Sequence, residues 1–124
     1  MTSLTDHAKN LLARAVAGRN PSLPTGAFLA LGTSGSDVAG LSGEPVGSGY
    51  ARQRVTFTGT GVQTNAEAVR FTFTAAAGTF THAGLFDAAT GGNPLTWAPL
   101  SAPAAVAGPG TVTINPGAFT ITGD

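Results

Sequence analysis

The sequence predicts a mainly β protein, an antiparallel β-sandwich of about seven or eight strands with one amphipathic α-helix at its N-terminus. Beyond residue 20 the chain divides into short apolar or alternating segments separated by Gly, Pro and Asn. Only the first 20 residues show helical spacing of apolar side chains. The total of 124 residues suits a single domain. We therefore expect residues 1–20 to form a helix or docking arm and residues 21–124 to form the sandwich domain.

The predicted helix covers residues 3–17. Its apolar side chains recur at the three- and four-residue spacing of one helix face: Leu4, Ala8, Leu11, Leu12, Ala15 and Val16. Ser3 is placed to cap the first turn, and Gly18 is placed to end the helix. A helix of this length is marginally stable alone. Its apolar face must therefore pack either on its own domain or on a neighbouring subunit.

The first predicted strands follow a Pro-containing linker. Residues 27–33 are a short apolar run, which is typical of a strand buried on both faces. Residues 34–49 are rich in Gly and Ser and predict a long exposed loop. Residues 68–76 alternate, so that Val69, Phe71 and Phe73 should face the core.

The C-terminal strands are shorter and more interrupted. Residues 79–88 and 95–100 predict strands joined by a turn, and residues 101–110 predict a Pro-broken edge or loop. Residues 111–114 and 118–122 flank the sequence Asn-Pro-Gly, which predicts a hairpin between them.

The predicted strand that begins at Tyr50 carries two of the six Lys and Arg residues. In an extended chain Tyr50, Arg52 and Arg54 share one face, opposite the apolar one, and we call this set the cationic ladder. One interpretation is an exposed strand whose charge prevents edge-to-edge aggregation, with pairing to Glu44 or Glu67. The other is a contact face, because the planar guanidinium group suits interfaces.

Composition excludes several classes of function. Only 10% of residues are charged and the net charge is zero, which argues against nucleic-acid binding and against a polybasic membrane anchor. With no Cys and only two His, one chain cannot form a zinc finger or a three-histidine site. No signal peptide and no apolar run of membrane-spanning length is visible. We expect no metal, no cofactor and no membrane association.

Catalytic motifs are equally scarce. His82 and Asp87 are the candidates for acid–base chemistry, but no nucleophile elbow, phosphate-binding loop or dinucleotide fingerprint accompanies them. A lone His among aromatic residues is more often a structural residue, and we expect no catalytic residue. Trp97 and Tyr50 could stack on a sugar, although a single Trp in a strand more often belongs to the core.

The order of segments resembles a family of small virion structural proteins of tailed bacteriophages, of the head-decoration and tail-fibre-like type. The resemblance covers most of the chain and is carried by these segments: LLARAVAG, AFLALGTS, GEPVGSGYARQRVTF and THAGLFDAATGGNPLTWAPL. None of them is a catalytic motif. The resemblance therefore implies an architecture and a role, and it implies no reaction.

This resemblance implies a non-enzymatic virion protein, made in the bacterial host cytoplasm, that decorates or cements the capsid surface. The alternatives are a tail-fibre or head-spike appendage protein and a glycan-binding module for host attachment. The implied partners are further copies of the chain, with a trimer expected from capsid three-fold positions, the major capsid protein or other virion subunits, and a host-surface glycan. The expected contact residues are either the helix face (Leu4, Leu11 and Leu12) or the cationic ladder.

Overall fold

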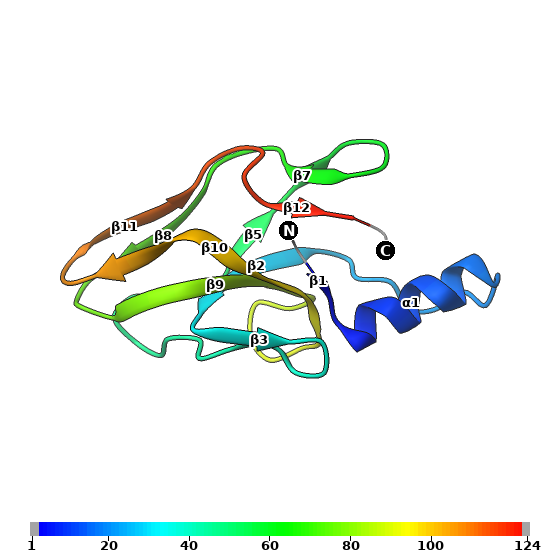
Figure 1. The fold of residues 1–124 in the computed structure, drawn as a ribbon, viewed down its shortest axis with the longest axis horizontal. Helices are drawn as coiled ribbons and strands as arrows, with labels where there is room; N and C mark the ends of the chain where they lie inside the picture. Colours follow the sequence, from blue (N-terminus) through cyan, green and yellow to red (C-terminus); the bar gives the residue numbers. More distant parts are fainter. Residues whose placement is uncertain (1–2, 123–124) are drawn as a thin grey trace.

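The computed structural model describes residues 3–122, which form a mainly β protein with one helix (Figure 1). The mainly β class with antiparallel sheets and one N-terminal helix is confirmed, but the described residues form twelve strands instead of the predicted seven or eight, because several strands are only two or three residues long. The elements are β1 (Ser3–Leu4), α1 (Asp6–Val16), β2 (Ala27–Gly32), β3 (Ser34–Ser36), β4 (Gly40–Ser42), β5 (Gln53–Val55), β6 (Phe57–Thr58), β7 (Gln63–Asn65), β8 (Val69–Phe73), β9 (Gly78–Phe86), β10 (Pro94–Val106), β11 (Gly110–Ile114) and β12 (Thr120–Ile121).

One layer of the sandwich is a five-stranded antiparallel sheet in the order β1-β10-β9-β2-β5. The shorter sheets β11-β8 and β12-β7-β6 face it. Side chains from both layers form one core cluster, in which Leu29, Leu31 and Leu85 meet Phe71 and Phe73. The inward alternation predicted for β8 and the burial predicted for β2 are confirmed, because these side chains are almost completely buried.

Helix α1 begins later than the sequence predicted. Ser3 and Leu4 pair with Trp97 and Thr96 of β10, so Ser3 cannot cap the helix. The cap is Thr5, whose Oγ1 accepts a hydrogen bond of 3.2 Å from the amide of Ala8. Ser3 and Leu4 instead pair their backbone with the edge of the main sheet.

The segment 34–49 is more ordered than the predicted long loop. It contains the antiparallel hairpin β3–β4, which packs against β10. Gly35 permits this close packing, because a Cβ atom there would lie 2.6 Å from Cε3 of Trp97. Only the Gly-rich half after β4 remains irregular.

The predicted C-terminal hairpin is wrong. Strand β11 pairs with β8, whereas β12 pairs with β7, so the turn at Asn115 carries the chain from one sheet to another. Buried Asn65 holds this crossing: its Nδ2 donates to the carbonyl of Asn115 at 2.9 Å, and its Oδ1 accepts from the amide of Phe119 at 2.9 Å. The Pro-broken segment predicted at 101–110 is largely part of β10, which continues past Pro99 through a register shift.

Candidate functional site

The cationic ladder does not form as predicted. Strand β5 begins only at Gln53, so Tyr50 and Arg52 precede it and do not follow its alternation. The ring of Tyr50 stacks on Phe71, with centroids 6.0 Å apart, and the side chain of Arg52 is only 8% exposed. The outward orientation predicted from the sequence is wrong for these two residues. Arg54 alone is exposed.

Arg52 joins two separate segments of the chain through its guanidinium group. Its Nε and Nη2 atoms donate to the two carboxylate oxygens of Glu44 at 2.8 and 2.9 Å, a bidentate pair. Its Nη1 atom donates to the carbonyls of Ala88 and Gly91 at 2.9 and 2.8 Å. The guanidinium carbon lies 3.7 Å from the ring centroid of Phe86. Arg52 therefore ties the loop after β4 to the turn between β9 and β10, and the predicted pairing with Glu44 is confirmed.

Tyr50 completes this network. Its hydroxyl donates to Glu44 Oε2 at 2.6 Å and accepts from the amide of Leu31 at 3.2 Å. Burial and the hydrogen bond to Glu44 raise the pKa of Tyr50 well above its usual value. Burial alone would raise the pKa of Glu44, but the hydrogen bonds from Arg52 and Tyr50 outweigh it and hold that pKa below its usual value. The carboxylate is therefore ionised and the phenol is neutral near pH 7.

The side chain of Trp97 also makes its contacts within the molecule. Its Nε1 atom donates to Asp37 Oδ1 at 2.9 Å, while Lys9 Nζ lies 2.9 Å from Asp37 Oδ2. The hydrogen bond from Lys9, and next that from Trp97, lower the pKa of Asp37. One face of the indole is covered by Gly35. Asp37 thus connects α1, the β3–β4 hairpin and β10, and the indole is poorly placed to stack on a sugar.

The candidate acid–base residues are not brought together. His82 Nδ1 shares a hydrogen bond of 2.8 Å with Thr81 Oγ1. Asp87 accepts hydrogen bonds from the amide and the Nδ2 group of Asn93 at 2.7 and 3.1 Å, which closes the β9–β10 turn. Within residues 3–122, no three His, Cys, Asp or Glu side chains gather as a metal site. In the same residues no helix is long and apolar enough to cross a membrane.

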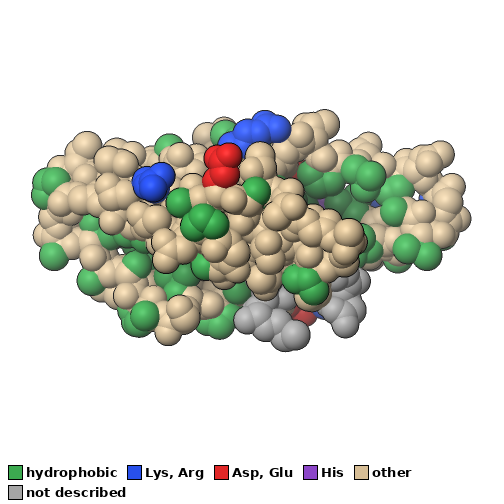
Figure 2. Space-filling view, turned by 90° about the horizontal axis from the view of Figure 1, so that it is seen from above, with side chains coloured by type: hydrophobic (Ala, Val, Ile, Leu, Met, Phe, Trp, Pro, Cys, Tyr) green, Lys and Arg blue, Asp and Glu red, His purple; other side chains and the backbone are tan. Residues whose placement is uncertain are grey.

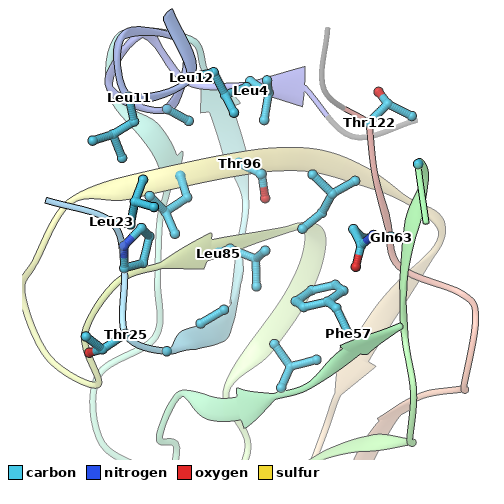
Figure 3. Close-up of a pocket in the computed structure, with 18 residues that line it drawn as sticks. Leu4, Leu11, Leu12, Leu23, Thr25, Phe57, Gln63, Leu85, Thr96 and Thr122 are labelled. Atoms are coloured by element: carbon cyan, nitrogen blue, oxygen red, sulfur yellow. The ribbon is translucent and has the colours of Figure 1, made fainter. Parts of the chain in front are cut away.

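An apolar groove of about 520 Å³ lies against α1 (Figure 3). Its walls come from the helix, the linker to β2 and both layers of the sandwich. Leu11 and Leu12 form part of the helix side, with Leu23 from the linker and Phe57 from β6. Within residues 3–122, no charged side chain lines it. A concave apolar site of this size is suited to bind an apolar side chain, helix or ligand.

The groove stays open because α1 projects from the body (Figure 1). Only Ala8 and Leu11 of the helix are buried. Gly18, with φ of 76°, ends the helix in the left-handed conformation. The linker that follows contains Pro21 and Pro24 and returns to β2 without a second helix.

Exposed apolar side chains surround this groove. Leu12 is 40%, Leu23 is 60% and Val16 is 89% exposed. Val62, which lies between two residues of the groove wall, is 53% exposed. On the face drawn in Figure 2, charged side chains are few, and several apolar ones gather toward the end that carries α1. An apolar patch around a groove is typical of a protein interaction site.

The predicted helix-face residues therefore have different environments. Leu4 and Leu11 are buried, whereas Leu12 is exposed at the rim of the groove. Leu23 and Val62 were missed by the sequence analysis. Their only signal was a large apolar residue in a Pro- or Gly-rich segment, where no helix or strand pattern requires one.

Comparison with known protein families gives a match over the whole described chain. A family model described as Podophage GP4 fiber I protein gp80 matches residues 3–122. The chain belongs to this family. The match includes α1 and all the walls of the groove, and it confirms the resemblance to small phage virion structural proteins. The protein is therefore a bacteriophage structural protein of the virion. No curated protein matches the sequence.

Proposed function

We propose that this protein is a non-enzymatic structural subunit of a podophage fibre, and that its apolar end attaches it to neighbouring subunits. The β-sandwich is the rigid body, and the groove with the projecting end of α1 is the attachment surface. The uncovered apolar groove, in a chain whose family is described as a fibre protein, carries this proposal. The separation of His82 from Asp87, each with its own hydrogen-bond partner, supports the non-enzymatic part.

Decoration of the capsid, which the sequence analysis favoured, is the alternative. The same apolar surface could bind a capsid lattice, where many copies would add their weak contacts. The description of the family favours the fibre. A glycan-binding role receives less support, because Trp97 donates its indole N–H to Asp37 and packs against Gly35.

Localisation on intact virions tests the proposal. Antibodies raised against the purified chain, detected with gold particles in the electron microscope, should label the fibres. Label spread evenly over the heads would instead support decoration of the capsid. Label on neither structure, in virions that contain the protein by mass spectrometry, would contradict both positions.

A further inference from the structure

We propose that the groove is filled by the projecting end of α1 from a second copy of this chain. Each copy then inserts its helix end into the groove of the next, and this head-to-tail contact closes the oligomer as a ring. This inference rests on the proposed structural role, since it names the neighbouring subunit.

The lining favours an apolar occupant, because none of the described side chains that form it is charged. The chain itself carries such a group. Leu12 and Val16 are four residues apart on α1, so they lie on the same face of the helix. Val16 is 89% exposed and does not line the groove of its own chain. One sequence thus contains both an open groove and an uncovered apolar helix end.

The helix cannot cover its own groove by bending back, because its first turn is fixed. Thr5 Oγ1 donates to the carbonyl of Pro94 at 2.7 Å, and the amide of Asp6 donates to the carbonyl of Asp37 at 2.8 Å. Lys9 is paired with Asp37 as well. The far half of the helix is therefore held away from the described body, where a neighbouring copy can cover it.

The required area favours a second copy over a small apolar ligand. A stable interface buries about 800 Å² on each partner, whereas a helix of 11 residues is only about 16 Å long. The contact must therefore extend beyond the helix, and exposed Leu23 and Val62 lie where it would extend. A ligand inside the groove would leave Val16 in water, but a neighbouring copy covers the groove and Val16 together.

The first test is the mass of the purified chain by light scattering after size exclusion. We expect a multiple of the chain mass at about 100 μM, where contacts with a Kd of tens of micromolar persist. Leu12→Glu and Val16→Glu should each raise the dissociation constant at least about tenfold and leave the circular dichroism unchanged. Val46→Glu is the matched control, because Val46 is 96% exposed and does not line the groove. Two results would overturn the proposal: a wild-type monomer at this concentration, or an oligomer that both Leu12→Glu and Val16→Glu retain.

The second test asks whether the contact joins different copies as proposed. The chain has no Cys, so Val16→Cys and Leu23→Cys can be made in chains that carry different short tags in the turn between β10 and β11, far from α1, and these chains can be mixed and treated with a short bis-maleimide. A cross-link between the two tags is expected, and a mixture of Val16→Cys with Val46→Cys should give far less. Equal yields from both mixtures would contradict a contact between the helix end of one copy and the groove of another. These tests use purified protein, so a monomer found on fibres would overturn this inference and leave the fibre proposal intact.

Discussion

At the scale of single residues, the central finding is that Arg52 stabilises the fold, although its position in the sequence suggested a surface role. It makes four hydrogen bonds and stacks on Phe86. Arg54, two residues later, is exposed and has one long hydrogen bond of 3.5 Å to the carbonyl of Thr25. Two arginines of the same segment thus have different roles, because the chain becomes regular only between them.

We predict that Arg52→Ala lowers the free energy of unfolding by about 2–4 kcal/mol, because it leaves Glu44 with Tyr50 as its remaining donor and leaves two carbonyl groups without the Arg52 donor. Arg54→Ala is the matched control and should change it by less than about 0.5 kcal/mol. Urea unfolding followed by circular dichroism measures both. Similar losses of unfolding free energy in the two variants would contradict this stabilising role of Arg52.

The pKa of Glu44 gives a second prediction. Because this pKa is lower in the folded state, the carboxylate contributes stability that is complete above its unfolded pKa, about 4.3, and is lost as the pH falls through the folded pKa. The free energy of unfolding should therefore fall as the pH is lowered from about 5. In Glu44→Gln this decline should be weaker, although Asp37, whose pKa is also lowered, retains its share. An unchanged slope would contradict a stabilising role for the ionised Glu44.

Thr96 provides a third test at this scale. It is 2% exposed, and its Oγ1 is buried at the wall of the groove with no hydrogen-bond partner among the residues that the structure describes. Thr96→Val removes an unsatisfied polar atom at nearly constant volume, so the melting temperature should stay the same or rise. Loss of more than about 1 kcal/mol would show that the hydroxyl has a partner.

At the scale of elements, the β3–β4 hairpin depends on a close approach to the single Trp of the chain. We predict that Gly35→Ala displaces the hairpin, because the new methyl group would overlap the indole of Trp97. The intrinsic fluorescence should shift to longer wavelength as the indole gains water. Gly108→Ala, where no atom lies within 4 Å of the added methyl group, is the control. Identical spectra for both variants would contradict this packing.

Local pattern predicted the elements whose own side chains decide their position. Val69, Phe71 and Phe73 alternate, and β8 follows that alternation into the core. The hairpin around Asn115 failed because its strands prefer distant partners in β8 and β7, and contacts so remote in sequence leave no local signal. The same limit explains Tyr50, which is drawn inward by the distant rings of Phe71 and Phe73.

The groove was only half predictable for a related reason. The apolar face of α1, including Leu11 and Leu12, follows from helical spacing. The direction in which the helix leaves the body does not, since it depends on hydrogen bonds from Thr5 and Asp6 to β10 and to the hairpin. Helical spacing alone therefore leaves open whether the helix packs on its own domain or on a neighbouring subunit.

At the scale of the whole molecule, the small number of charged residues determines how association should depend on salt. The chain carries six basic and six acidic residues, and none of those within residues 3–122 lines the groove. We predict that the dissociation constant of the oligomer changes less than about threefold between roughly 0.1 and 0.5 M NaCl, because screening affects charged contacts and not apolar ones. Weakening by more than about tenfold would point to an interface held by ion pairs.

The first and last parts of the described chain meet at one place, since Leu4 and Thr122 both line the groove. Any foreign sequence joined to either terminus is therefore expected to crowd the site of assembly. The turn at residues 107–109, between β10 and β11, lies at the end of the molecule opposite α1 (Figure 1). A peptide displayed on the assembled particle is best inserted at that turn, where it would point away from the neighbouring copies.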